Sequence, residues 1–243
     1  MNTTRMITLL ALCATASSAS ADTVTWNGSS GLLPTQITPP YTLVDNAVAN
    51  PVLSGGILTL NTSSEPLTYM LYDQSGLQLA VPSNLVIEAN MRFVSGTSPG
   101  TTRAPAGIQF VPAPGLLNFL WIQSDLIFLN QTGDVRGPSA VVDTDGAFHT
   151  YRIEVTGQSL GSAVNVFYDN GAIPVLTGAL FATASTTTFI DWGDLTDSPG
   201  TGGISEWQSF QHNAGVPEPN SAILLLFTGG CLLARRIRAR NAQ

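Results

Sequence analysis

The sequence predicts an all-β domain built as a two-sheet antiparallel β-sandwich. Between the two ends of the chain, no stretch keeps a helical periodicity. Short runs of β-branched and aromatic residues recur instead, separated by clusters of Gly, Pro, Asn and Asp at the spacing that sandwich strands show. Several of these runs alternate apolar and polar residues, which is the pattern of strands with one buried and one wet face. We therefore expect one all-β domain over residues 22–212.

The alternation is clearest in residues 85–94. Successive side chains of a strand point to opposite faces, so every second residue of this run belongs to one face. The residues that we expect in the core are Ile87, Ala89, Met91 and Phe93. The polar residues between them are expected to face solvent.

A β-hairpin is predicted around Asn170-Gly171, which lies between the strand-like runs 164–168 and 172–176. Asn-Gly tolerates the positive φ angles of a type I′ turn. Just upstream, residues 148–155 alternate again after a turn that ends at Gly146. The sequence thus predicts three consecutive antiparallel strands here.

The run from Asp145 to Phe210 resembles the concanavalin A-like, laminin G-type jelly roll. The segments that carry the resemblance are residues 145–151, the Tyr168-Asp169-Asn170-Gly171 hairpin, residues 190–194 and residues 206–210. They cover about a third of the mature chain. The resemblance implies two stacked antiparallel sheets, often with a glycan or a calcium ion at one rim or on the concave face.

The N-terminal residues 1–21 are predicted to be a secretory signal peptide. Arg5 provides a positive charge, an apolar run follows over residues 6–14, and small residues fill positions 17–21. Ala19 and Ala21 satisfy the small-x-small rule for cleavage, so signal peptidase is an expected partner and Asp22 the mature start.

The C-terminal residues 213–243 are predicted to form a linker, one transmembrane helix and a basic end. A helix over residues 222–234 spans about 20 Å, short of the roughly 30 Å hydrocarbon core. Arginines beside an apolar helix favour the cytoplasmic face and shorten the required span by snorkelling, so the preceding domain faces outward. These arginines begin with Arg235 and Arg236.

The same segment resembles the PEP-CTERM sorting signal of Gram-negative bacteria, which an exosortase recognises. The resemblance lies in Pro217, Glu218 and Pro219, the short helix with Gly229 and Gly230, and the Arg-rich end. It implies cleavage near residues 217–219 and a link to exopolysaccharide and biofilm production. The expected location is an inner-membrane-tethered precursor, followed by the cell surface or extracellular matrix.

The charge of the mature domain restricts its partners. Residues 22–215 contain four arginines, no lysine and 15 of the 16 carboxylates of the chain, which gives a net charge of −11. Such a domain repels phosphate backbones, so nucleic acid is excluded as a partner. It repels anionic polysaccharides too, unless a cation bridges the two.

No catalytic pattern is found, and we expect the protein not to be an enzyme. Laminarinase-type relatives carry Glu-x-Asp-x-x-Glu on one strand, and this sequence has no such string. It also lacks a Gly-x-Ser-x-Gly elbow, and the domain offers only His149 and His212 as a base. We interpret His149 as structural and place His212 in the linker.

Calcium is the cofactor that the sequence allows. Asp191, Asp194 and Asp197 are expected to line one loop, and closely spaced carboxylates are the ligands that this ion takes. The alternative is an ordinary acidic turn. Asp143 and Asp145 form a second candidate site, although their spacing fits the EF-hand loop badly.

Exposed aromatic residues beside polar side chains could stack against sugar rings. The candidates are Trp192, Trp121, Trp207 and Tyr72. Trp192 is expected in a rim loop between Asp191 and Asp194. The alternative for these residues is packing between the two sheets.

Together these features predict an exported surface or matrix-associated protein, non-catalytic, which binds glycan or exopolysaccharide. Two alternatives stay open. One is a secreted glycan-active hydrolase on the same fold, and the other is a purely structural component of the matrix.

Overall fold

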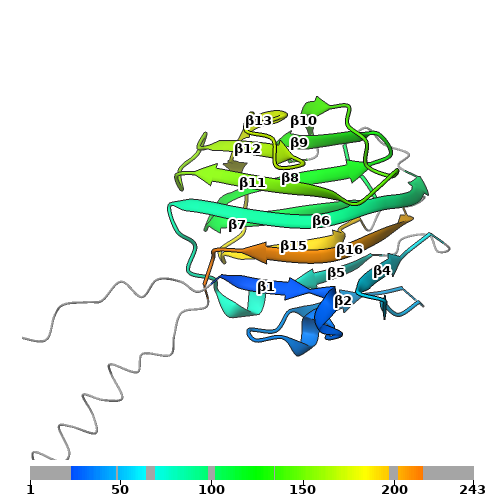
Figure 1. Ribbon diagram of the computed structural model, residues 1–243. Coiled ribbons are helices and arrows are strands. Elements are labelled where there is room, and N and C mark those ends of the chain that lie inside the picture. Colours follow the sequence, from blue (N-terminus) through cyan, green and yellow to red (C-terminus); the bar gives the residue numbers. More distant parts are fainter. Residues whose placement is uncertain are drawn as a thin grey trace, which may run out of the picture.

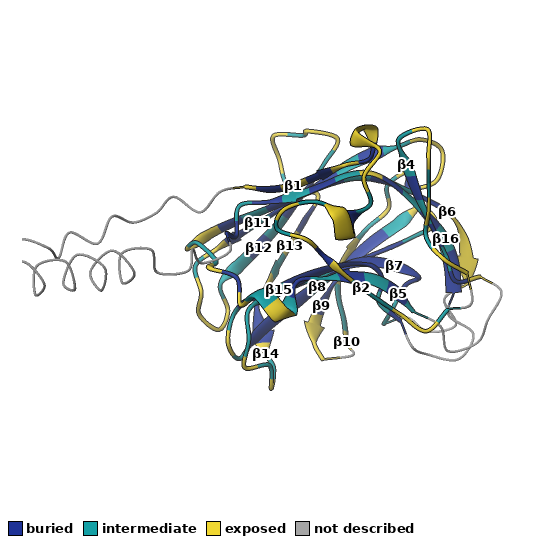
Figure 2. Ribbon diagram, turned by 90° about the horizontal axis from the view of Figure 1, so that it is seen from below, coloured by how far each residue is buried: buried dark blue, intermediate teal, exposed yellow. Residues whose placement is uncertain are grey.

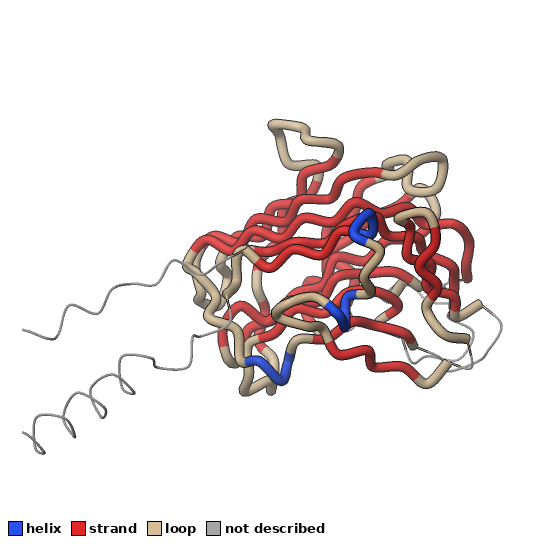
Figure 3. The backbone as a smooth tube through the Cα atoms, turned by 60° about the horizontal axis from the view of Figure 1, so that its bottom comes forward, coloured by secondary structure: helices blue, strands red, loops and turns tan. Residues whose placement is uncertain are grey.

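The computed structural model describes residues 23–47, 49–63, 69–97, 102–133, 135–196 and 202–215. The predicted signal peptide, the predicted transmembrane helix and the sorting residues Pro217, Glu218, Pro219, Arg235 and Arg236 lie outside them. Among the described residues, no helix is long and apolar enough to cross a membrane. Strands dominate the described chain, and its helices are short 3-10 turns (Figure 3). These are η2 (Gly28–Ser30), η3 (Pro34–Gln36) and η4 (Ser75–Leu77).

The strands form two eight-stranded antiparallel sheets that pack face to face (Figure 1). Sheet A has the order β13-β12-β11-β6-β16-β4-β3, with β1 also paired to β16. Its strands are β1 (Val24–Asn27), β3 (Val52–Ser54), β4 (Ile57–Asn61), β6 (Asn84–Thr97), β11 (His149–Thr156), β12 (Ala163–Tyr168), β13 (Leu176–Ala179) and β16 (Gly202–His212).

Sheet B has the order β10-β9-β8-β7-β15-β5-β2, with β14 also paired to β8. Its strands are β2 (Thr42–Asp45), β5 (Met70–Asp73), β7 (Ala106–Ala113), β8 (Leu116–Gln123), β9 (Leu126–Thr132), β10 (Val135–Ala140), β14 (Phe181–Ala182) and β15 (Phe189–Asp194). The predicted all-β, two-sheet antiparallel sandwich is confirmed.

Strand β6 shows how the sequence pattern becomes structure. Ile87, Ala89 and Met91 are 0% exposed and Phe93 is 2% exposed, as their alternation predicts. The polar residues between them are half-buried on the outer face of sheet A, the face turned away from sheet B. β6 pairs with β11 on one side and β16 on the other, so this strand lies inside sheet A.

The predicted hairpin forms, but its turn is one residue earlier than expected. β11, β12 and β13 are consecutive antiparallel neighbours. The two residues with positive φ are Asp169 (50°) and Asn170 (60°), and the Gly171 amide donates to the Tyr168 carbonyl at 3.0 Å. Asn-Gly therefore occupies the last two positions of the turn, and β13 begins only at Leu176.

Trp192 lies at the centre of the core and not in a rim loop. Its side chain is 0% exposed. Successive side chains of β15 point to opposite faces, and because Asp191 points outward, Trp192 points into the core. Its ring stacks on Phe210 at 4.9 Å between centroids and contacts Trp207 at 4.8 Å and Tyr72 at 4.9 Å. Figure 2 shows such buried residues along the strands, with exposed residues mainly in the connections. Trp192, Trp207 and Tyr72 thus hold the two sheets together, and none of them offers a face to a sugar.

Trp121 is also buried, but on the outer face of sheet B. It is 2% exposed and packs with Ala104 and Phe128 in a small apolar cluster separate from the main core. Its ring stacks on Phe119 at 5.2 Å, and its Nε1 donates to Asn130 Oδ1 at 2.9 Å. Both faces and the polar edge of the indole are therefore used within the fold.

The first and last described strands lie side by side. Val24 of β1 pairs with His212 of β16, so the chain enters and leaves the sandwich at one end. His212 belongs to β16 and not to a linker. It is 1% exposed, and its Nε2 lies 2.8 Å from Gln74 Oε1. Burial lowers the pKa of His212 to about 4, so this side chain is neutral at physiological pH.

Candidate functional site

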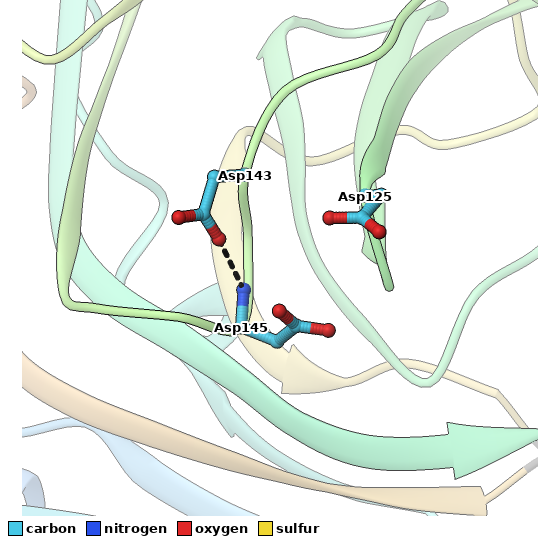
Figure 4. Close-up of side chains that lie close together, drawn as sticks. All are labelled: Asp125, Asp143 and Asp145. Atoms are coloured by element: carbon cyan, nitrogen blue, oxygen red, sulfur yellow. Dashed lines mark hydrogen bonds between the residues drawn. The ribbon is translucent and has the colours of Figure 1, made fainter.

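Three aspartates from two connections come together at one end of the sandwich (Figure 4). Asp125 lies in the two-residue turn between β8 and β9, whereas Asp143 and Asp145 lie in the connection from β10 to β11. Each contributes a carboxylate oxygen to a group whose members all lie within 4.8 Å of one another. We call Asp125, Asp143 and Asp145 the acidic triad. All three are exposed.

Thr144 fixes the two connections relative to each other. It is 0% exposed, and its Oγ1 donates to the Gln123 carbonyl at 2.7 Å and accepts from the Asp125 amide at 3.0 Å. Its own carbonyl accepts from the Phe93 amide of β6 at 2.7 Å. The carboxylates on both sides of Thr144 are therefore set by a buried hydrogen-bonded residue and not by flexible contacts at the surface.

Two members of the triad have their orientation set by local hydrogen bonds. Asp143 Oδ1 accepts from the amides of Gly146 at 2.9 Å and Asp145 at 3.2 Å. The hydrogen bond from Gly146 is the largest cause that lowers the pKa of Asp143, with smaller contributions from the Asp145 amide and His149. Ser124 Oγ donates to Asp145 Oδ2 at 2.8 Å. The turn thus favours the ionised form of the Asp143 carboxyl group.

His149 and its neighbours form a second layer beneath Asp143. His149 is 9% exposed, with Nδ1 2.8 Å from Asp169 Oδ2 and Nε2 3.6 Å from Asp143 Oδ2. The Tyr168 hydroxyl donates to the Asp143 carbonyl at 2.6 Å. These contacts tie the β12 hairpin turn to the triad, which is the structural role expected for His149.

The donor set of the triad suits a hard divalent cation. Calcium takes six to eight oxygen ligands at about 2.4 Å, so two oxygens on opposite sides of one ion are about 4.8 Å apart. The three carboxylate oxygens lie within that span. Because the triad is exposed, water or hydroxyl groups of a ligand can complete the coordination.

Of the residues first predicted as calcium ligands, Asp191 and Asp194 do not share a site. Asp191 and Asp194 both lie in strand β15 and not in a loop, and Asp197 lies outside the described residues. Asp194 is 2% exposed, and its Oδ1 accepts from the Thr196 amide at 3.0 Å and hydroxyl at 2.7 Å, while Oδ2 accepts from the Thr62 hydroxyl. Its oxygens are therefore occupied by protein donors.

Asp191 is held in a carboxyl pair with Asp73. The two residues are cross-strand neighbours on the outer face of sheet B, next to Gln109. Asp191 is 7% exposed, and its pKa is raised well above the usual range, first by burial and then by the hydrogen bond and negative charge of Asp73. The protonated form of Asp191 is therefore favoured at this position.

Asp125 is the member of the triad that the sequence analysis missed. The available signal was local: Ser124-Asp125 separates two apolar runs and reads as a tight turn, and Asp125 adopts a positive φ of 54°. Its proximity to residues 143 and 145 depends on the pairing of β8 with β9 and on the path from β10 to β11. No pattern within a single segment reports that proximity.

Comparisons with known proteins support the fold. No protein-family model matches the sequence, and no curated protein matches it. Among solved structures, it is similar to a protein of unknown function from Shewanella oneidensis MR-1, with 14% identity, a TM-score of 0.50 and coverage of 81% of this chain and 87% of that one. At this identity the likeness establishes the two-sheet architecture alone.

Two further solved structures are similar at lower scores. One is the endo-1,3-beta-glucanase from Streptomyces sioyaensis, with 12% identity, a TM-score of 0.49 and coverage of 80% and 96%. The other is the exoplasmic/lumenal domain of VIP36 in its Ca2+/Man2-bound form, with 9% identity, a TM-score of 0.44 and coverage of 80% and 89%. The function of this chain has to be argued from its own residues.

Proposed function

We propose that this chain is an exported, non-catalytic surface protein whose β-sandwich binds extracellular glycan through a divalent cation held by the acidic triad. The observation that carries the proposal is the convergence of Asp125, Asp143 and Asp145 from two separate connections. Calcium is the ion that such a hard oxygen set favours.

A bound cation would allow a domain with this negative charge to bind an acidic polysaccharide. Residues 22–215 carry a net charge of −11, so an acidic polysaccharide is repelled from the bare surface. An ion at the triad reverses that repulsion locally. Its open coordination positions can be filled by sugar hydroxyls or carboxylates, which makes the contact dependent on the cation.

Export and sorting complete the proposal. The signal peptide over residues 1–21 directs the chain to signal peptidase, and the PEP-CTERM-like tail over residues 213–243 directs it to an exosortase. The tethered precursor would then be processed near Pro217–Pro219 and reach the cell surface or matrix. A role in exopolysaccharide or biofilm organisation follows from the resemblance of this tail.

A glycan-active hydrolase is the second candidate, and the Asp73–Asp191 pair favours it. A buried carboxyl group with a raised pKa is a typical general acid. The geometry supports it less well, because glycosidase carboxyl groups stand about 5 to 9 Å apart and these two share a hydrogen bond. Release of reducing ends from a bound glycan, lost in Asp191→Asn, would establish the hydrolase.

The test of the proposal is a pair of measurements on the full-length chain in detergent. Calcium should raise the melting temperature, and Asp145→Asn should weaken calcium binding about tenfold because one of three ligand charges is lost. Asp45→Asn, an exposed carboxylate at the end of β2, is the matched control and should behave as wild type. A glycan array with calcium or with EDTA gives the second readout.

The outcomes separate the alternatives. Calcium-dependent glycan binding that is lost in Asp145→Asn supports the proposal. A calcium shift without glycan binding would assign the triad to stability and the protein to the structural components of the matrix. No calcium shift in wild type would refute the cation site.

A further inference from the structure

A second feature lies on the outer face of sheet A, away from the acidic triad. A hollow of about 400 Å³ opens between the end of β1, the turn from β3 to β4 and the middle of β16. Its lining residues are Asn27, Ser29, Gly55, Gly56, Asn90, Gln208 and Ser209. The triad neither borders nor shares residues with it.

The lining is polar but carries no charge. It consists of amide and hydroxyl side chains and glycine backbone, in a domain whose net charge is −11. On the same face, Arg92 and Glu206 form an ion pair of 2.7 Å, and Glu88, which lies two residues from Asn90 along β6, accepts a hydrogen bond from Gln211 at 3.0 Å. An uncharged ligand with many hydroxyl groups fits this chemistry, because amides and hydroxyls both donate and accept hydrogen bonds.

Three of the polar side chains form a row across the strands. Asn27 pairs with Ser209, and Ser209 pairs with Asn90, so their side chains project from the same face of neighbouring strands. Cross-strand neighbours on one face are about 5 Å apart, a spacing comparable with the hydroxyl groups along a sugar chain. The row therefore presents hydrogen-bonding groups in a line.

The side chain of Asn90, which lines the hollow, has a hydrogen-bond acceptor without a partner. Its Nδ2 donates to Thr150 Oγ1 at 3.1 Å, but its buried Oδ1 has no hydrogen-bond partner. Buried acceptors are almost always paired, so an exception calls for an explanation such as a ligand donor. Asn165 on the same face of sheet A gives the contrast, because its Oδ1 accepts from Thr177 Oγ1 at 3.0 Å.

The backbone around the hollow is also specialised. The pairing register of β16 with β6 shifts between Trp207 and Ser209, which turns Gln208 outward as an exposed residue at a bulge. Beside Gln208, a Cβ at Gly28 would meet the Gly56 carbonyl oxygen at 2.1 Å, so glycine at position 28 is required for the two loops to approach this closely. Bulges of this kind re-aim side chains at binding sites.

We propose that the hollow binds a segment of a neutral polysaccharide, independently of any cation. Asn90, Gln208 and Ser209 provide the hydrogen bonds, and the Gly55-Gly56 turn lets the sugar approach the backbone. The site is distinct from the triad, so it gives the domain a second glycan contact on its other sheet. Glycan binding at this hollow does not depend on the proposed cation-dependent binding at the triad.

The experiment is ligand-observed saturation-transfer NMR on the full-length chain in detergent, with EDTA present throughout. The probes are laminarihexaose, maltohexaose and cellohexaose as neutral glycans and an oligoguluronate hexamer as an anionic one. The variants are Asn90→Ala and Gln208→Ala, with Asn165→Ala as the matched control on the same face of the sheet. We expect at least one neutral glycan to bind with a millimolar Kd, and each site variant to weaken it at least fivefold.

Retained binding in Asn165→Ala, with loss in the other two variants, establishes the site. Three results would overturn it: no neutral glycan binds, Asn90→Ala and Gln208→Ala both bind as wild type, or the anionic hexamer binds equally well. Because EDTA removes any calcium, failure of the triad proposal leaves this result unchanged. Circular dichroism of each variant separates loss of the site from loss of the fold.

Discussion

At the scale of single residues, aspartates in this domain have very different environments. Asp143 is exposed in a turn whose amides lower its pKa. Asp191 is buried beside Asp73, and Asp194 is buried among hydroxyl donors. The first is available to a cation, whereas Asp191 is closed off by burial beside a second carboxyl group and Asp194 has both oxygens bonded to protein donors. Residue type alone therefore identifies possible ligands but not usable ones.

The buried state of Asp194 leads to a pH-dependent prediction. Burial raises its pKa to about 6 despite the opposing hydrogen bonds from Thr62 and Thr196, so the folded state binds this proton more tightly than the unfolded chain does. The resulting stabilisation is complete below about pH 4 and is lost as the pH rises through 6. Relative to wild type, Asp194→Asn should gain stability over this window, approaching about 3 kcal/mol at pH 7.

The variant is expected to fold because an asparagine can replace the protonated acid. Its Nδ2 can donate to Thr62 Oγ1, which already lies 3.2 Å from the Gly203 carbonyl and can donate there. Urea denaturation at four pH values between 4 and 7 measures the difference. Asp125→Asn, exposed and measured without calcium, is the control. A constant offset between Asp194→Asn and wild type across the window would contradict the prediction.

At the scale of elements, the triad depends on how two connections are joined. The β8–β9 turn and the β10–β11 connection meet through buried Thr144. Its hydroxyl donates a hydrogen bond to the Gln123 carbonyl and accepts one from the Asp125 amide. Strand pairing brings these segments near each other, but the hydroxyl sets their separation. Cation affinity should therefore respond to a residue that carries no ligand atom.

We expect Thr144→Val to lower calcium affinity at least fivefold. Valine keeps the shape of threonine but leaves the Gln123 carbonyl and the Asp125 amide without their partner, which should also cost about 1–3 kcal/mol of folding free energy. Isothermal titration with calcium measures the affinity. Thr177→Val, at an exposed site in β13, serves as control. Unchanged calcium affinity in Thr144→Val would show that the connections hold their places without this hydroxyl.

Elements with a local signature could be predicted from the sequence, and sites built across elements could not. The alternation in β6 correctly predicts its buried face, because the period of two follows from strand geometry alone. The same period of two applies to Trp192 in β15. Its neighbours Asp191, Gly193 and Asp194 favour a loop in the sequence, because Asp and Gly are depleted in strands. Tertiary packing overrides that preference here, since Trp192 contacts aromatic rings from both sheets.

The acidic triad could not be predicted from a local pattern. Asp143 and Asp145 are visible as a pair in the sequence, but Asp125 joins them only once β8, β9 and β10 have paired. The hollow on sheet A likewise combines residues of β1, β6 and β16 with the β3–β4 turn. Long-range pairing is a property of the whole topology, which no single stretch encodes.

At the scale of the whole molecule, the end of the described chain and the triad lie apart along β6. His212, close to the start of the proposed sorting tail, pairs with Ile87. The Phe93 amide donates to the carbonyl of Thr144, which lies between Asp143 and Asp145 of the triad. Six residues of strand separate these points, about 20 Å at 3.3 Å per residue. If the tail tethers the chain as proposed, the triad lies away from the point of attachment.

This arrangement gives a prediction for the tail in a host that has an exosortase. Replacement of Pro217, Glu218 and Pro219 by alanine should leave the uncleaved chain in the membrane fraction, because the recognised motif is gone while the apolar run and its arginines remain. Fractionation and intact mass of the product measure this. Replacement of Asn220 and Ser221 by alanine, which keeps the motif, is the control and should be processed normally. If both variants are processed equally, the tail is not sorted through this motif. Because the triad lies far from the attachment point, the retained variant should still bind calcium with wild-type affinity.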